Sequence, residues 1–348
     1  MAYTTIDKPT DYFTSFLWTG DGSTSPRSHT GVGLQADMMW SKVRSAGHQH
    51  NLVDTVRGVN QRLLMPSDNG DEDTTCTHGH FDSLDSDGFT TTNAGGNWNV
   101  NASGNTYVGW FWKAGGSASS NSNGTITSSV SANTTSGFSV ATWTGTGSNG
   151  SVGHGLGGVD FMIIKDRDNN RNWYTWNKTF AYNDRIKLDT NSAKETGTDN
   201  MTALPDSTKI NMATSTQNNG SSIDYVGYFF QEKKGYSKFG SYKGNGNADG
   251  TFVYTGFKTA WLLVKKSSGT GDWFLIDNKR STINPTNHQL EANSSAAEDA
   301  SGRFDFLSNG FKCVSSSTGS NGSGTTYIYM AFAESPFVTS TGIPTTAR

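Results

Sequence analysis

The sequence WTGDG at residues 18–22 returns as WTGTG at residues 143–147 and as YKGNG at residues 242–246. A second motif follows each of these, as TYVGWFW at 106–112, DYVGYFF at 224–230 and TYIYMAF at 326–332. The repeat is too long for one rung of a solenoid, whose period is about 20–50 residues. The two motifs therefore predict three consecutive copies of a complete folding unit.

The composition favours short strands joined by turns. Charged residues make up 16% of the 348 residues, aromatic residues 12%, and there are 41 glycines. This aromatic content is not typical of a disordered chain. The net charge of −3 gives no electrostatic reason to bind nucleic acid, and no apolar run is long enough to span a bilayer. We therefore expect neither nucleic-acid binding nor membrane insertion.

Each copy reads as a series of strands. Apolar runs at 38–42, 159–165 and 261–265 lack alternation, which is typical of strands buried on both faces, and each ends in a lysine. Asp-Gly at 87–88 and Asn-Gly at 309–310 predict two-residue hairpin turns whose central residues have positive φ. We predict an all-β fold of three tandem homologous jelly-roll-like β-sandwich repeats with Gly/Ser/Asn-rich loops. In the alternative arrangement the repeats exchange strands and are not separable.

The repeats divide the chain into four segments. These are repeat 1 with an N-terminal arm (1–113), a Gly/Ser/Asn/Thr-rich linker (114–136), repeat 2 (137–234) and repeat 3 with a C-terminal tail (235–348). The linker composition predicts a flexible or extended connector in which residues 125–130 could add an edge strand, so repeat 1 could be hinged. Cys76 and Cys313 stand at non-equivalent places, which gives no support to a disulfide framework.

Several stretches resemble a known family. The sequence at 12–22, GVGLQAD at 31–37, WSKVR at 40–44 and the closing segment at 329–337 are similar to a domain of unknown function in structural proteins of marine bacteriophages, such as cyanophages and pelagiphages. The resemblance covers nearly the whole chain. It implies a lectin-like (concanavalin A-like) sandwich in a virion or tail-fibre protein, made in the host cytoplasm and released by lysis.

The resemblance also sets expectations for partners and function. We expect a non-enzymatic host-recognition module that adheres to a host-surface glycan and contacts other virion proteins. A homotrimer is expected because cyclic symmetry multiplies weak contacts. Two alternatives remain, a capsid decoration or head-fibre protein and a glycan depolymerase. We expect no cofactor.

Two histidine pairs are candidate metal ligands. His48 and His50 form one pair, and His78 and His80 form the other, beside Cys76. Residues i and i+2 of a strand share a face, so each pair could present two imidazoles to one ion. The alternative is exposed histidines in polar loops, which the lack of equivalents in repeats 2 and 3 favours.

The candidate glycan contact is Trp98 with its neighbours Asn97 and Asn99, and the alternative is that Trp98 anchors its loop by packing. Trp98 lies in a polar loop and has no counterpart in the other repeats, and exposed aromatic rings stack on sugars while amides bind hydroxyls. Acidic loops at 68–73 and 85–87 are weaker candidates for calcium, because a hairpin turn explains the second one better.

One carboxylate recurs between repeats. Asp54 and Asp277 align, each followed three residues later by an arginine, Arg57 or Arg280, whereas repeat 2 carries Trp176 at the aligned place. Glycoside cleavage needs two carboxylates on either side of the bond, and no such pair recurs. We interpret Asp-x-x-Arg as a structural ion pair and predict that the protein is not an enzyme.

Overall fold

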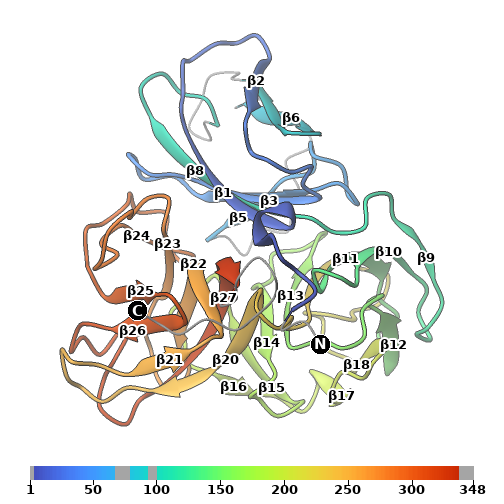
Figure 1. The fold of residues 1–348 in the computed structure, drawn as a ribbon. Coiled ribbons are helices and arrows are strands. Elements are labelled where there is room, and N and C mark those ends of the chain that lie inside the picture. The colour runs from blue at the N-terminus through green and yellow to red at the C-terminus, as the bar shows by residue number, and fades with distance from the viewer. Residues whose placement is uncertain (1–3, 67–78, 93–99, 337–348) are drawn as a thin grey trace.

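The computed structural model describes residues 4–66, 79–92 and 100–336. Within these ranges the chain forms six sheets of antiparallel strands, and the one helical segment is the short 3-10 helix η1 (Pro9–Asp11) (Figure 1). The predicted all-β fold class is confirmed. No helix in the described ranges is long and apolar enough to cross a membrane.

Residues 13–112, which we call unit 1, form two sheets. The larger has the order β1-β8-β3-β4-β5 and the smaller the order β2-β7-β6. The strands are β1 (Phe13–Thr19), β2 (Arg27–Thr30), β3 (Met38–Val43), β4 (His50–Asp54), β5 (Leu63–Met65), β6 (His80–Asp85), β7 (Gly88–Thr92) and β8 (Thr106–Trp112). Side chains of both sheets, among them Trp18, Phe89 and Phe111, share one buried cluster, so the unit is a sandwich.

Residues 237–336, unit 3, repeat this order strand for strand. The larger sheet is β20-β27-β22-β23-β24 and the smaller is β21-β26-β25. The strands are β20 (Ser237–Lys243), β21 (Phe252–Tyr254), β22 (Phe257–Lys266), β23 (Trp273–Asp277), β24 (Gln289–Glu291), β25 (Phe304–Leu307), β26 (Gly310–Cys313) and β27 (Thr326–Pro336). Tyr242, Phe304 and Phe311 belong to the cluster between its two sheets.

Residues 119–230, unit 2, contain the same order with additions. The larger sheet is β16-β15-β14-β13-β19-β11-β10-β9 and the smaller is β12-β18-β17. The strands are β9 (Ser119–Asn121), β10 (Ser128–Asn133), β11 (Phe138–Thr144), β12 (Gly150–Gly153), β13 (Phe161–Asp166), β14 (Tyr174–Asn177), β15 (Asp184–Lys187), β16 (Glu195–Thr196), β17 (Met201–Ala203), β18 (Lys209–Met212) and β19 (Asp224–Phe230). The segment 114–136, expected to be a connector, thus supplies two strands of this sheet, β9 and β10.

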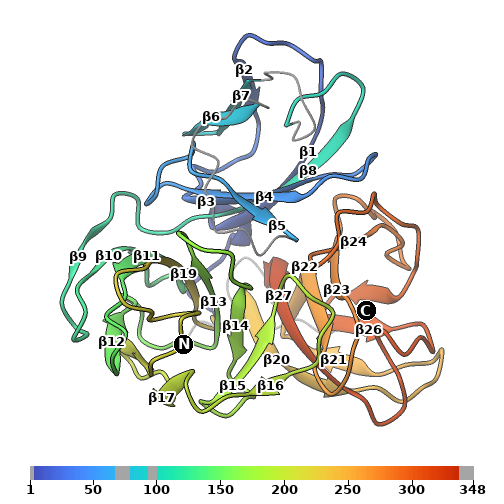
Figure 2. The same cartoon turned by 180° about the vertical axis from the view of Figure 1, so that it is seen from behind.

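The three large sheets meet at a common centre, as the two opposite views show (Figures 1 and 2). The central cluster takes side chains from every unit. Phe13 of unit 1 stacks on Phe332 of unit 3 with ring centroids 4.9 Å apart, and Trp112 of unit 1 contacts Phe230 of unit 2 at 6.4 Å. Unit 1 is therefore packed into the body and is not hinged. Each of the six sheets takes all its strands from a single unit. No strand is therefore exchanged between units in the part of the chain that the structure describes.

This arrangement explains the apolar runs. The six residues of β3 and of β13 are all buried, because one face of each strand packs in the sandwich and the other faces the centre. Met39 of β3 lies in the sandwich cluster of unit 1, while its neighbours Met38 and Trp40 lie in the central cluster. A continuous apolar run is the expected pattern for a strand covered on both sides.

The two predicted hairpins form, but the predicted turn residues were wrong. Asp85 pairs with Gly88, so residues 86 and 87 make the turn and Gly88 begins β7. Neither residue 87 nor Gly88 has positive φ. Glycine is needed there because a Cβ at Gly88 would lie 1.8 Å from the carbonyl oxygen of His29, and one at Gly310 would lie 2.0 Å from that of Val253. These glycines allow a neighbouring strand to approach closely.

Each apolar run ends in a buried lysine with the same contact. The ammonium groups of Lys42, Lys165 and Lys265 donate to the carbonyl oxygen of the next residue at 2.8, 3.0 and 2.8 Å. Each also donates to a second carbonyl oxygen, that of Ala46 (3.4 Å), Arg171 (2.8 Å) and Asn191 (3.3 Å) respectively. Burial lowers the pKa of Lys42 and of Lys265 to about 8. These lysines hold the chain as it leaves the central strand.

Replacing Lys265 by methionine should flatten the pH dependence of stability. Burial lowers the pKa of Lys265 from 10.5 to about 8, so between these values the unfolded chain binds a proton that the folded chain does not. The stability that Lys265 contributes is therefore present above 10.5 and is lost as the pH falls through about 8. Urea unfolding of both proteins across this window measures the slope, with exposed Lys243→Met as the control. A pH-independent difference between wild type and K265M would contradict the prediction.

Candidate functional site

The recurrent aspartates lie at contacts between units. Asp54 and Arg57 form an ion pair at 2.6 Å, as do Asp277 and Arg280, and all four side chains are fully buried. The two predicted Asp-x-x-Arg ion pairs are therefore present. The strand register places Asn177, not Trp176, at the equivalent position of unit 2, because Asn177 pairs with Phe161 as Asp54 pairs with Met38.

Each aspartate also accepts a hydrogen bond from a neighbouring unit. Trp110 of unit 1 donates through Nε1 to Asp277 of unit 3 at 2.9 Å, and the hydroxyl of Tyr228 in unit 2 donates to Asp54 of unit 1 at 2.7 Å. By the same register Met330 stands in unit 3 where Trp110 and Tyr228 stand. Methionine has no proton to donate, and unit 2 correspondingly lacks the aspartate.

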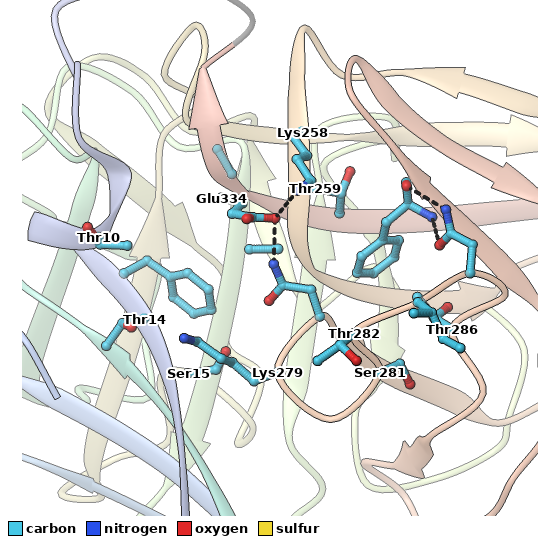
Figure 3. A pocket seen from close by; sticks show the side chains of 17 residues that line it. Thr10, Thr14, Ser15, Lys258, Thr259, Lys279, Ser281, Thr282, Thr286 and Glu334 are labelled. Carbon is cyan, nitrogen blue, oxygen red and sulfur yellow. Dashed lines mark hydrogen bonds and ion pairs between the residues drawn. The ribbon is translucent and has the colours of Figure 1, made fainter. Parts of the chain in front are cut away.

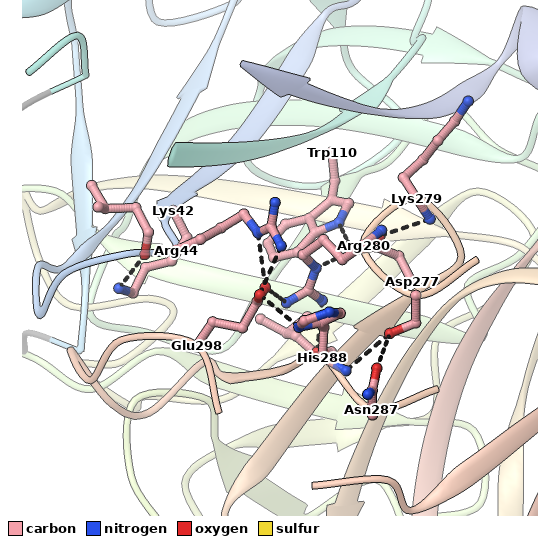
Figure 4. A network of polar contacts seen from close by, with 12 residues as sticks. Lys42, Arg44, Trp110, Asp277, Lys279, Arg280, Asn287, His288 and Glu298 are labelled. Atoms are coloured by element: carbon pink, nitrogen blue, oxygen red, sulfur yellow. Dashed lines mark hydrogen bonds and ion pairs between the residues drawn. The ribbon is translucent and has the colours of Figure 1, made fainter. Parts of the chain in front are cut away.

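A polar network joins units 1 and 3 (Figure 4). Arg44 donates twice to Glu298, at 2.9 and 2.8 Å, and Arg280 donates to the same carboxylate at 3.1 Å. His288 Nδ1 lies 2.9 Å from it. Burial opposes ionisation of Glu298, but the bonds from Arg44 and Arg280 prevail and lower its pKa. The network fixes the position of unit 3 against unit 1.

His50, a candidate metal ligand, is a buried part of this contact. Its Nδ1 lies 3.0 Å from Nε1 of Trp40, which can only donate, and its Nε2 lies 2.9 Å from the carbonyl oxygen of Glu291, which can only accept. The ring is therefore neutral with its proton on Nε2. Burial and the charge of Lys42 lower the pKa of His50 to about 3. Neither ring nitrogen of His50 is left for a metal ion.

The repeat register shows why a histidine occurs there. His50 precedes Asp54 by the same number of residues as Trp173 precedes Asn177 and Trp273 precedes Asp277, so the three rings occupy equivalent positions. Trp273 donates through Nε1 to the carbonyl oxygen of Lys187 in unit 2 at 2.8 Å. His50 makes the matching bond to Glu291 in unit 3, so the position calls for a ring N–H donor between units.

The other predicted site residues are only partly visible. Trp98, Asn97, Asn99 and His78 lie outside the described residues. His48 is half-buried, and His80 on β6 lies 2.8 Å from Asp82. Residues 4–66, 79–92 and 100–336 contain no group of three or more His, Cys, Asp or Glu side chains placed to hold a metal ion. The acidic loop 68–73 is likewise outside the described ranges, while Asp87 accepts backbone N–H bonds from Gly31 and Gly33.

A cleft of about 700 Å³ lies between unit 1 and unit 3 (Figure 3). The segment η1 and strand β1 of unit 1 form one wall, and unit 3 contributes β22, the end of β27 and the loop after β23. The lining is rich in hydroxyl and amide side chains, namely Thr10, Thr14, Ser15, Thr259, Asn278, Ser281, Thr282, Asn284 and Thr286. Lys258, Lys279 and Glu334 carry charge. We call this the 3–1 cleft.

Two side chains contact Glu334 in the cleft. Its carboxylate accepts from Asn278 Nδ2 at 2.7 Å and pairs with Lys258 Nζ at 3.0 Å. Ser15 Oγ is buried and has no hydrogen-bond partner in the described part of the chain. Ile283, at the rim, is 77% exposed. The cleft thus combines free hydroxyl groups, paired charges and one exposed apolar side chain.

The family model that matches the chain spans residues 8–336 and is described as a domain of unknown function, DUF7483. The chain belongs to the DUF7483 family. No curated protein and no solved structure matches it. The match crosses all three units and both sides of the 3–1 cleft, so the family domain is the whole triple sandwich.

In this member of the DUF7483 family the junction of units 2 and 3 carries a cluster of ion pairs. Backbone hydrogen bonds of Asn278 to Ala260 and of Lys178 to Asp160 identify the equivalent positions. There Glu232 replaces Glu334, and Lys238 of β20 replaces Thr14 of β1. Glu232 pairs with Lys178 at 2.6 Å and with Lys238 at 2.9 Å.

The 3–1 cleft has threonine in place of that lysine. Lys238 spans the 2–3 junction, whereas the short side chain of Thr14 leaves the equivalent space empty of protein atoms. The junction of units 1 and 2 has a smaller cleft of about 550 Å³ whose lining includes Gly115 and Gly116 of the connecting segment. Sequence reasoning missed the 3–1 cleft, although alignment of the repeats shows the change from Lys238 to Thr14.

Proposed function

We propose that this protein is a non-enzymatic module of a phage virion, such as a tail fibre or its tip, that adheres to a glycan on the host surface. The observation that carries the proposal is the 3–1 cleft with its hydroxyl and amide lining. Sugar hydroxyls donate and accept hydrogen bonds, and Thr, Ser and Asn side chains match both roles. The phage assignment comes from the sequence resemblance.

The surroundings of the cleft are rigid, which suits binding of a ligand without a conformational change. The central cluster and the network of Arg44, Arg280 and Glu298 hold both walls in place, so a ligand meets a preformed surface. Preformed sites lose less entropy on binding. We further propose that the three units are tandem homologous copies of one jelly-roll-like, lectin-like sandwich, which their common strand order supports.

Adhesion should depend on intact cell-surface sugars. Fluorescently labelled protein is expected to bind susceptible marine bacteria and to slow phage adsorption. Periodate, which cleaves vicinal diols, should abolish binding when cells are treated beforehand. Protease-treated cells are the control and should keep the binding. The absence of binding to any strain, or binding that periodate leaves unchanged, would argue against adhesion.

A capsid decoration or head-fibre role is the second candidate. The shared core of the three units favours it, because such a body suits a passive spacer between particle parts. Antibody labelling of imaged particles separates the two roles, since a decoration protein would cover the head. The expected homotrimer stays a prediction.

A further inference from the structure

We infer that the 3–1 cleft binds a saccharide that carries an acidic substituent, with Lys279 as the cation that pairs with the acid. The inference rests on the proposed glycan adhesion and narrows its ligand class. It depends on the charges in the cleft, on its unpaired hydroxyl and on the difference between the three junctions.

The charges of the cleft leave one cation uncompensated. Lys258 and Glu334 form an ion pair at 3.0 Å, and Asn278 supports the same carboxylate, so these two charges balance each other. Lys279 is exposed, lines the cleft and forms no ion pair with any described residue. Figure 3 shows its side chain extending toward Ser15 of β1. A carboxylate or sulfate in the cleft would supply the missing partner.

The hydroxyl groups point to a sugar rather than to a simple anion. Ser15 Oγ is buried at the wall without a hydrogen-bond partner among the described residues, and buried polar atoms are normally paired. Thr10, Thr14 and Thr282 line the cleft around it. A simple anion would satisfy Lys279 alone, whereas a sugar ring also presents hydroxyl groups to these side chains.

The rim adds an apolar contact. Ile283 is 77% exposed on the loop after β23. Covering this apolar side chain with a ligand would remove apolar surface from water, which is favourable. The C–H face of a pyranose ring is a suitable partner for it. With Lys279 and the hydroxyl wall, the cleft presents the three kinds of contact that an acidic sugar needs.

The 3–1 and 2–3 junctions differ at the equivalent position of the first strand, which is Thr14 in β1 and Lys238 in β20. At the 2–3 junction Lys238 fills the equivalent space and pairs with Glu232. The fold therefore tolerates a lysine at this position of the first strand. The substitution Thr14→Lys copies that arrangement and should close the 3–1 cleft without unfolding the protein.

The test measures binding of acidic glycans beside their uncharged counterparts. The probes are oligogalacturonate, sialyllactose and a sulfated carrageenan oligosaccharide, against oligogalactose, lactose and the desulfated oligosaccharide, with titration calorimetry on the full chain. At least one acidic probe should bind about tenfold more tightly than its counterpart, as expected for one partly desolvated charge pair. Lys279→Met should remove that preference, Thr14→Lys should abolish binding, and Lys243→Met, on an exposed lysine elsewhere, should change neither. Circular dichroism and thermal unfolding check that each variant is folded.

Other outcomes overturn the inference in distinguishable ways. Equal binding of acidic and neutral probes, lost in T14K, would refute the acidic ligand and leave glycan adhesion standing. Acidic binding that T14K and K279M do not alter would place the site elsewhere. Galacturonate monomer or acetate that binds as tightly as the oligosaccharide would indicate a simple anion site. If no probe binds while periodate-sensitive adhesion to cells persists, the inference fails and the proposed function does not.

Discussion

Trp261→Ala is expected to lower the free energy of unfolding by about 3–5 kcal/mol, the usual cost of removing a large aromatic side chain from a core. Trp261 is fully buried, and its ring lies against Trp40, Trp110, Trp112, Phe13 and Phe332. Four of these rings belong to unit 1 and one to unit 3. The loss therefore falls on the contact between units as well as on unit 3 itself.

Guanidinium unfolding followed by far-UV circular dichroism measures the effect. Because the core is shared, the whole transition should move to lower denaturant concentration. Trp261→Phe is the matched control, since unit 2 carries Phe161 at the equivalent position and phenylalanine also removes the indole N–H, which has no partner in the described ranges. It should cost less than half as much. A shift confined to about one third of the signal would show that the units unfold independently, contrary to a shared core.

Asp277→Ala is expected to lower the free energy of unfolding by a similar amount, about 3–5 kcal/mol, because it removes the aspartate that pairs with the buried Arg280. The same carboxylate accepts from Arg280 Nε at 2.6 Å, from Trp110 Nε1 at 2.9 Å and from the backbone N–H of Arg280 at 2.8 Å. Glu298 still contacts Arg280 at 3.1 Å, which limits the loss but does not replace these bonds. The measurement is again equilibrium unfolding.

The chain itself supplies the compensating change. Unit 2 has Asn177 and Phe180 where unit 3 has Asp277 and Arg280. The double variant Asp277→Asn with Arg280→Phe removes both charges together, so it should be clearly more stable than D277A. If the double variant were as unstable as the single one, the cost would lie in lost packing and not in an unpaired charge.

The strands were predictable because their signal is local. The run at 159–165 has no alternation, a pattern that indicates a strand buried on both faces, and β13 within it is buried throughout. The ends of the runs were equally clear, since each lysine closes its strand in the same way. The hairpins at 85–88 and 307–310 were found from Asp-Gly and Asn-Gly, although the glycine serves a close strand approach and not the turn.

The central cluster was not predictable from the sequence. The pattern of apolar residues along a strand indicates which of its faces are buried, but not which other segment covers each face. Phe13 and Phe332 are over three hundred residues apart in sequence and stack only because the large sheets converge. The connector predicted at 114–136 contains the strands β9 and β10. Its small polar residues are typical of linkers, yet β10 pairs along β11 in regular register.

His50 shows how a spacing can mislead. The sequence HQH suggested two imidazoles on one face, but the aligned residues are Trp173 and Trp273, whose shared property with histidine is a ring N–H donor. Predicting the 3–1 cleft requires the strand register of two units, since Glu334 of unit 3 and Thr14 of unit 1 both line it. Comparing the repeats position by position, rather than searching each for motifs, gives the signal for both sites.

Encoding three units in one chain has a consequence for how such a protein can change. In a ring of three identical subunits every substitution occurs three times, so an ion pair gained at one boundary is gained at all three. Here the three boundaries mutate separately. One boundary is held by the ion pairs of Glu232 with Lys178 and Lys238, while another has a cleft beside Thr14. Substitutions can therefore change the surface at a single boundary, while the contacts at the other two boundaries keep the molecule rigid.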